Sequence, residues 1–300
     1  MLKASLVDPA SVDFILPLGN LNPPAHTLPT DHIYFYVGFL RPEIRAVPVF
    51  APGDGVVQTV LRSAAPDVKL FVRVNSTFTY YVDHVVPEPG IVQGTMLTAG
   101  QRLGTSGTGG FGVDLGVINA SLTLPFITPA RYPADSLHAD APLKYYEEPL
   151  RSRLYALVRR EGADKDGKID FDEPGRLQGN WFHETLPIAE SAQSTGWSRH
   201  LAFVYDNIRP AQPRISIGGV LLMTGAFAVD AADPPFASVT PQSGIVGYHL
   251  RRGGALGAPP EFPVGSLIVQ MLDGSRLRIE TARTTTPPTA FSAAAQVYVR

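Results

Sequence analysis

The stretches DHIYFYVGFL at residues 31–40 and TFTYYVDHV at residues 77–85 decide the fold class of the chain. Both are rich in β-branched and aromatic residues, which favour extended strands, and neither has apolar residues at helical spacing. Outward from these two stretches, short apolar runs alternate with Gly and Pro, which is typical of strands joined by turns. In the first part of the chain, the further expected strands are residues 47–50, 55–61, 69–74 and 112–118.

The composition suits a turn-rich, mainly β protein. The chain has 300 residues with 28 Gly, 28 Pro and no Cys, so it is long enough to bury a core without disulfides. Only 17% of the residues are charged, the net charge is −2, and there is no basic stripe, so we do not expect nucleic acid as a partner. No apolar run is long enough to span a membrane, and no signal peptide is visible in residues 1–20.

Changes along the sequence indicate two domains and a connection. We expect a β domain at residues 1–120, a proline-rich linker with one helix at residues 121–162, and a second β domain at residues 163–300. The helix is expected at about residues 149–161, where apolar residues recur at helical spacing after a proline and before Gly162.

The second β domain is expected to be an antiparallel barrel or sandwich. About eight short strands separated by turns are typical of these architectures. The dipeptide Asp273-Gly274 lies between two apolar runs and predicts a hairpin. The expected strands are residues 179–184, 201–205, 214–223, 226–229, 244–250, 266–272, 276–281 and 294–299.

A series of short motifs runs through the first domain in a fixed order. The chain reads APGDGVV from Ala51, YVDH from Tyr81, GIVQG from Gly90, AGQRLGTSG from Ala99 and GVDLGV from Gly112. Over residues 26–118 this order resembles the landmarks of lysostaphin-type (M23-like) zinc endopeptidases. The resemblance implies a β-sandwich peptidase fold in the first domain.

The resemblance also implies a zinc site. In the family, two His and one Asp hold zinc, which activates a water molecule at an open position. On this sequence the matching ligands are His26, Asp31 and Asp114, and His84 matches the catalytic histidine that would stabilise the oxyanion. Gly112 stands where the family has the first histidine of its last motif, so one catalytic group is missing.

Three functions follow from these residues. The leading hypothesis is a degenerate M23-like domain that binds a peptide or glycan of the cell wall or periplasm with little or no hydrolysis, in an exported or periplasmic protein. One alternative is an active zinc endopeptidase. The other is a non-enzymatic protein that binds a small ligand in the second-domain barrel. A simpler interpretation of the zinc residues also stays open, because His26 and Asp31 are common turn residues and a buried Asp114 needs only a partner.

An acidic loop follows the predicted helix. Asp164, Asp166, Asp170 and Glu173 match calcium-ligand positions of an EF-hand loop, but Gly162 stands at its first position and Pro174 prevents the exiting helix. We therefore favour an ordinary Asp-Gly turn over a weak calcium site and do not expect calcium as a cofactor.

The second domain opens with Gly179-Asn180-Trp181, which resembles the G-x-W opening of lipocalin-like (calycin) barrels. That resemblance implies that Arg300 packs on Trp181 by a cation–π contact. The alternative is that Trp181 is an ordinary core residue.

Overall fold

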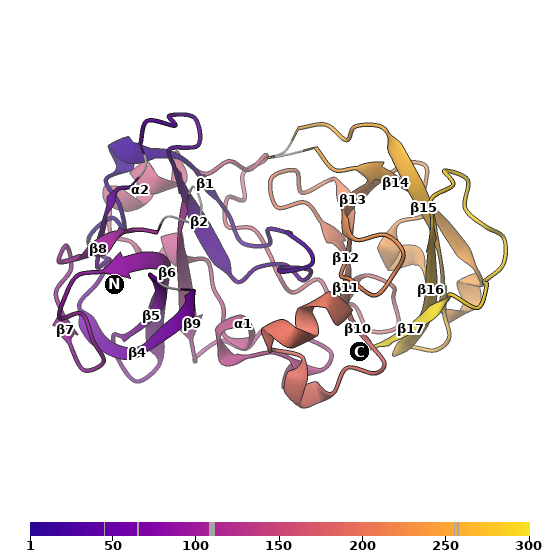
Figure 1. The fold of residues 1–300 in the computed structure, drawn as a ribbon, viewed down its shortest axis with the longest axis horizontal. Coiled ribbons are helices and arrows are strands. Elements are labelled where there is room, and N and C mark those ends of the chain that lie inside the picture. The colour runs from indigo at the N-terminus through magenta and orange to yellow at the C-terminus, as the bar shows by residue number, and fades with distance from the viewer. Residues whose placement is uncertain (45, 65, 108–111, 255, 257) are drawn as a thin grey trace. The chain divides into compact units, whose positions relative to one another are not determined.

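The computed structural model describes residues 1–300 except 45, 65, 108–111, 255 and 257 (Figure 1). It is mainly β, with few and short helices, so the expected fold class is confirmed. By their internal contacts, the residues form two compact units. The first contains Met1–Leu18, Asp31–Leu124 and Ala134–Gly167, and the second contains Gly19–Thr30, Pro125–Pro133 and Lys168–Arg300.

The strands of the first unit form one antiparallel sheet, which is nine-stranded over the described residues. Its main path runs β1-β2-β9-β6-β5-β4-β7, and β8 pairs with both β3 and β6. Strand β6 joins the two parts because its first residues pair with β9 and its last with β8. The strands are β1 Val12–Leu16, β2 His32–Val37, β3 Pro48–Phe50, β4 Gly55–Ala64, β5 Asp67–Arg73, β6 Phe78–Pro87, β7 Met96–Leu97, β8 Arg102–Ser106 and β9 Gly112–Asn119.

Alternation along the central strands separates a core face from a polar face. On β2, Ile33 and Phe35 are buried in the core, and Tyr34 between them points to the other face. The register pairs Ile33 with Leu115 of β9, which in turn pairs with Val82 of β6. One apolar layer therefore covers one side of these three strands.

Short helices complete the first unit. The expected helix at 149–161 is present only as α2, Leu150–Tyr155. It ends early because the backbone of the following residues pairs with β1: Ile15 donates its N–H to the carbonyl of Leu157 and accepts from the N–H of Arg159. The other helical segments of this unit are η1 Pro9–Ser11, α1 Ala134–Leu137 and η3 Pro142–Tyr145.

The second unit is a closed antiparallel barrel of eight strands over its described residues. Each strand pairs with the next along the chain, and β17 returns to β10; these strands run from orange to yellow in Figure 1. All eight predicted strands are present, and the predicted hairpin at Asp273-Gly274 joins β15 to β16. The strands are β10 Gly179–His183, β11 His200–Tyr205, β12 Pro213–Ile217, β13 Gly225–Val229, β14 Val246–Arg252, β15 Pro263–Met271, β16 Arg276–Ala282 and β17 Gln296–Val299.

The barrel interior is filled by side chains. Every strand contributes at least one buried apolar residue to a single cluster, from Trp181 on β10 to Tyr298 on β17. Short 3-10 helices occupy the connections: η2 Pro129–Arg131, η4 Ile188–Glu190, η5 Ser194–Arg199, η6 Phe236–Ser238 and η7 Pro241–Ser243.

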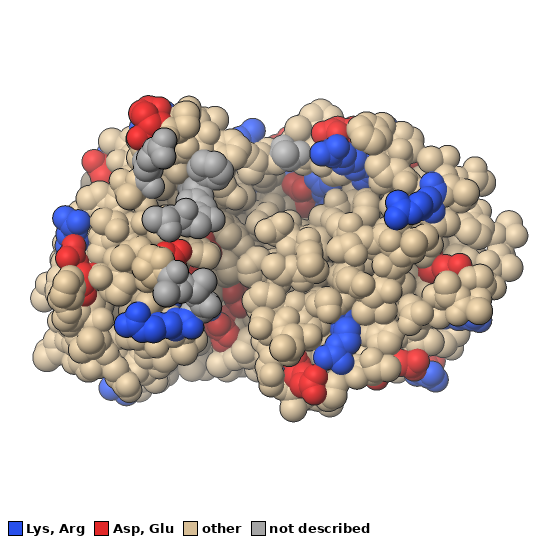
Figure 2. Space-filling view, in the orientation of Figure 1, with Lys and Arg blue, Asp and Glu red and all other residues tan. Residues whose placement is uncertain are grey.

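Charged side chains are scattered over the face drawn in Figure 2, where basic and acidic residues lie among uncharged ones. Within the described part of the chain, no helix has the length and apolar character needed to cross a membrane.

Candidate functional site

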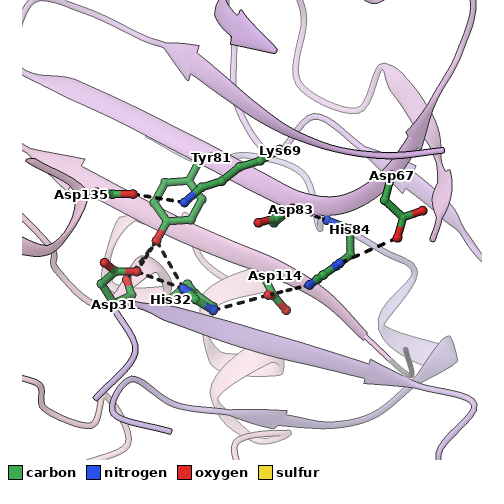
Figure 3. A network of polar contacts seen from close by, with 9 residues as sticks. All are labelled: Asp31, His32, Asp67, Lys69, Tyr81, Asp83, His84, Asp114 and Asp135. Carbon is green, nitrogen blue, oxygen red and sulfur yellow. Dashed lines mark hydrogen bonds and ion pairs between the residues drawn. The ribbon is translucent and has the colours of Figure 1, made fainter. Parts of the chain in front are cut away.

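A cluster of charged side chains lies on the polar face of the first unit, on and beside the central strands (Figure 3). The register places His32 of β2 opposite Gly116 of β9, and the next residue on that face, Tyr34, opposite Asp114. On the other side of β9, Asp114 faces Asp83 of β6. Strand alternation therefore brings His32 and Asp114 to the same face.

His32 and His84 lie on either side of Asp114. The Nε2 atom of His32 is 3.4 Å from Oδ2 of Asp114, and Nε2 of His84 is 3.6 Å from the same oxygen. At the outer end, Nδ1 of His84 is 3.8 Å from Oδ2 of Asp67. At the inner end, Nδ1 of His32 is 3.0 Å from Oδ1 of Asp31. Carboxylates and imidazoles thus alternate across the face.

Asp31 is held by two further side chains. The Tyr81 hydroxyl donates a 2.6 Å hydrogen bond to Oδ1, and the Ser136 hydroxyl of α1 donates a 2.5 Å hydrogen bond to Oδ2. Burial alone would raise the pKa of Asp31, but the hydrogen bond and charge of His32, the charge of Lys69 and the Ser136 hydrogen bond lower it. These interactions favour the ionised form of Asp31, and both of its oxygens accept hydrogen bonds.

The pKa values of Asp114 and His32 are raised, whereas that of Asp31 is lowered. Burial raises the pKa of Asp114 to about 6, against the opposing charges of His32 and His84. Burial opposes protonation of His32, but the hydrogen bond to Asp31 and the charges of Asp114 and Asp31 outweigh it and raise the pKa of the imidazole. The arrangement favours a protonated His32 between two carboxyl groups.

His84 adopts an unusual backbone conformation. Its φ angle of 61° lies in the left-handed region, which is uncommon for a residue other than glycine. The Asp83 side chain accepts the His84 N–H at 2.8 Å, and β6 changes its partner from β9 to β8 directly after this position. The imidazole is 53% exposed, so it is the accessible member of the cluster.

Tyr81 and Lys69 close the inner end of the cluster. Lys69 Nζ lies 3.9 Å from the centre of the Tyr81 ring and 3.1 Å from Oδ2 of Asp135. The Tyr81 ring occupies the space above Gly116, where an added Cβ would lie only 2.0 Å from its Cζ atom. Glycine at 116 is therefore required for the ring to cover this end of the site.

The predicted zinc ligands are placed in different units. Asp31 and Asp114 belong to the first unit, on either side of His32, whereas His26 belongs to the second, where its ring packs against Trp197. Over the described residues, no three His, Cys, Asp or Glu side chains are grouped so that they could hold a metal. A zinc site formed by His26, Asp31 and Asp114 therefore stays a prediction.

The side chains of the cluster are engaged with one another in this structure. A zinc-binding imidazole is neutral and offers a lone pair. Both ring nitrogens of His32 face carboxylates, and the oxygens of Asp31 accept from a tyrosine, a serine and His32. The hydrogen bonds therefore engage Nδ1 of His32 and both oxygens of Asp31.

Sequence reasoning missed His32, although a signal was present. In HIYFYV, the residues His32, Tyr34 and Tyr36 alternate with apolar core residues and so share a face. Gly112 lies opposite Tyr36, on the same face as Asp114. The sheet therefore has no side chain at the position where the resemblance expects a catalytic histidine.

The residues of the acidic loop have partners near them in sequence or within their own unit. Asp164 pairs with Arg160 at 3.1 Å, and Asp166 accepts a 2.6 Å hydrogen bond from the Tyr155 hydroxyl. In the second unit, Glu173 accepts a 2.7 Å hydrogen bond from the Gln178 amide, and Asp170 lies 3.9 Å from Lys168. The preference for an ordinary turn over a calcium site in this segment stays a prediction.

The second unit contains the expected packing of Arg300 on Trp181. The guanidinium carbon lies 3.9 Å from the centre of the Trp181 ring, and Nη1 donates to the carbonyl of Glu173 at 2.8 Å. Nη2 donates to the carbonyls of Leu177 and Gln178. The contact is confirmed, and the wider likeness to calycin barrels stays a prediction.

Comparison with known proteins gives only distant likenesses. No known protein family and no curated protein matches the chain. Among solved structures, a zinc-containing peptidase from Vibrio cholerae is similar with a TM-score of 0.33 and 18% identity, over 40% of this chain and 37% of that one. Csd3 from Helicobacter pylori gives a TM-score of 0.31 and 16% identity, over 40% and 31%. The solution structure of lysostaphin gives a TM-score of 0.29 and 12% identity, over 90% and 80%.

The matched region therefore spans well under half of the Vibrio and Helicobacter proteins. At these scores the likenesses assign no activity to the chain.

Proposed function

We propose that the first unit is a peptidase-like domain that binds a peptide or glycan of the bacterial cell envelope and hydrolyses it little or not at all. The observation that carries the proposal is the environment of His32, whose Nδ1 and Nε2 atoms lie 3.0 Å and 3.4 Å from the carboxylates of Asp31 and Asp114.

A hydrolytic centre of this kind needs a neutral imidazole and a free carboxylate to bind a metal. In this cluster, charge is neutralised between side chains instead. Asp31 is fixed by Tyr81 and Ser136, and the raised pKa of His32 favours the form without a lone pair. This supports a binding role over zinc-dependent hydrolysis.

Gly112 supports the same conclusion. An enzyme of the resembling family uses a histidine side chain at the matching position, and Gly112 offers none. Hydrolysis would need another group near Asp114 to stabilise the developing charge.

The accessible part of the cluster is suited to recognition. His84 is half exposed and lies between Asp114 and Asp67, so its ring can exchange hydrogen bonds with a polar ligand. The β6 backbone around it is fixed by pairing on both sides, which orders the ring before a ligand arrives.

The experiment is co-sedimentation of the full chain with purified peptidoglycan, combined with a hydrolysis assay on the same material. We expect sedimentation that weakens in His84→Ala, and no released fragments with or without added zinc. Release of fragments that requires both zinc and His84 would restore the active endopeptidase. No sedimentation with folded wild type would exclude peptidoglycan as the ligand.

A further inference from the structure

A row of aromatic side chains extends from the cluster along β2. The ring centres of His32 and Tyr34 lie 4.8 Å apart, and those of Tyr34 and Tyr36 lie 6.3 Å apart. Beyond the end of the strand, Phe39 packs edge-on against Tyr36 at 5.7 Å. We call Tyr34, Tyr36 and Phe39 the aromatic row.

The far end of the row is both exposed and fixed. Phe39 is 38% exposed, yet its backbone N–H and that of Leu40 are accepted by Oδ2 of the buried Asp13, at 2.8 Å and 3.0 Å. The other oxygen of Asp13 accepts from Nε of Arg41 at 2.7 Å. The Asp13 carboxylate therefore fixes the backbone that carries the exposed phenyl ring, and the ring packs edge-on against Tyr36 and Phe14, which reduces the entropy that ligand binding would cost.

Opposite the middle of the row, the neighbouring strand has a glycine. Tyr36 pairs with Gly112 of β9, which has no side chain to lie against the ring. On its other side, Tyr36 stacks on Phe14 of β1, with ring centres 4.7 Å apart and an interplanar angle of 20°. The Tyr36 ring is therefore supported by β1 and left without a side-chain neighbour at the paired position of β9.

The position of β2 in the sheet limits what the row can bind. An extended peptide commonly binds by adding a strand to a sheet edge through main-chain hydrogen bonds. Strand β2 is paired with β1 on one side and β9 on the other, so its backbone groups are already used. A ligand of this face must be recognised by side chains alone.

We infer that the aromatic row binds the pyranose rings of a glycan, with the His84–Asp114 pair as the polar end of the same subsite. This rests on the proposed binding function and names its ligand class. The flat aromatic faces suit the C–H faces of sugar rings, and the Tyr36 hydroxyl and the half-exposed imidazole of His84 suit sugar hydroxyls.

The test is calorimetric titration of the full chain with N-acetylglucosamine hexamer, glucose hexamer and a peptidoglycan stem peptide. Wild type is expected to bind at least one hexamer. Phe39→Ala and Tyr36→Leu are expected to weaken that binding by about tenfold, the size of a lost aromatic contact. The matched control is Phe262→Ala, which removes a phenylalanine that is 56% exposed in the second unit, and it should bind like wild type. Circular dichroism checks that each variant is folded.

Several outcomes would overturn the inference. One is wild-type affinity in both Phe39→Ala and Tyr36→Leu, and another is an equal loss in Phe262→Ala. Binding of the stem peptide alone, unchanged in Phe39→Ala, would leave the proposed binding function standing and remove the sugar subsite. The two hexamers distinguish a ligand with acetamido groups from a plain glucan.

Discussion

His32 and Asp114 lie on adjacent strands of the first unit, with Nε2 and Oδ2 3.4 Å apart. The contact pairs a buried carboxyl group with an imidazole whose pKa is raised by the hydrogen bond to Asp31 and by the charges of Asp114 and Asp31. It also explains how Asp114 is tolerated although the residue is only 4% exposed, because a buried carboxylate requires a partner.

Tyr81→Phe should destabilise the first unit more than Tyr80→Phe. Both tyrosines are fully buried, but the Tyr81 hydroxyl donates to the ionised Asp31, whereas that of Tyr80 donates to the carbonyl of Gly53. Losing a hydrogen bond to a charged group costs about 1.5–3 kcal/mol, against about 0.5–1.5 kcal/mol for a neutral one. Urea unfolding of the two variants measures the difference. Equal losses would mean that Asp31 does not depend on Tyr81.

Gly116→Ala should be strongly destabilising, by about 1–3 kcal/mol or more, because the new methyl group would collide with the Tyr81 ring. Gly112→Ala is the matched change on the same strand. Its Cβ would lie 3.2 Å from the carbonyl oxygen of Phe35, a tight contact without overlap of a ring. The melting temperature of Gly116→Ala should lie well below that of Gly112→Ala. The reverse order would contradict the described position of Tyr81.

His200 should make the second unit sensitive to acid. Burial lowers the pKa of this imidazole to about 4, and the charges of Arg131 and Arg199 act in the same direction. In the unfolded chain, the imidazole has a pKa near 6.5. The stability that the neutral His200 contributes is therefore complete above about pH 6.5 and is lost as the pH falls toward 4. The full loss is roughly 3 kcal/mol.

The measurement is unfolding of wild type and His200→Gln between pH 4 and 7. The difference in stability between the two proteins should shrink as the pH falls, because only wild type has the imidazole. A difference that does not change with pH would show that the pKa of His200 is the same in the folded and unfolded states, and would contradict the prediction.

Arg300→Ala should destabilise the barrel by roughly 2–4 kcal/mol, because it removes a cation–π contact and leaves backbone carbonyls without their donor. Arg278→Ala is the control, since Arg278 also lies over an aromatic ring, Phe291 at 4.7 Å, but is only half-buried. We expect a loss below about 1 kcal/mol there. Similar losses would indicate that the carbonyl contacts of Arg300 contribute little.

Local sequence patterns were sufficient for the strands, whereas one long-range contact was predicted only from the resemblance to calycin barrels. Period-two alternation and turn residues predicted all the barrel strands, and the chain end was matched correctly to Trp181. The helix at 149–161 was overestimated because residues beyond Tyr155 pair with Ile15, which is distant in sequence. Local periodicity contains no information about such a competing partner.

The site was predicted only in part for the same reason. Asp31, His84 and Asp114 do lie in one cluster, but spacing along the chain selected His26 instead of His32. Whether a side chain joins a cluster depends on strand register, and the alternation in HIYFYV placed His32 on the face of Asp114. Three further members of the cluster come from other elements: Lys69 lies on β5, and Asp135 and Ser136 lie on α1. No sequence pattern near HIYFYV predicts that they join the cluster.

The most direct test of the account is the zinc content of the full chain, loaded with zinc and then dialysed against metal-free buffer. We predict far less than one zinc per chain in wild type, and the same amount in Asp114→Ala, because His32 and Asp31 are engaged with other side chains. About one zinc per wild-type chain, lost in Asp114→Ala, is the stoichiometry of a single metal centre and would contradict the account.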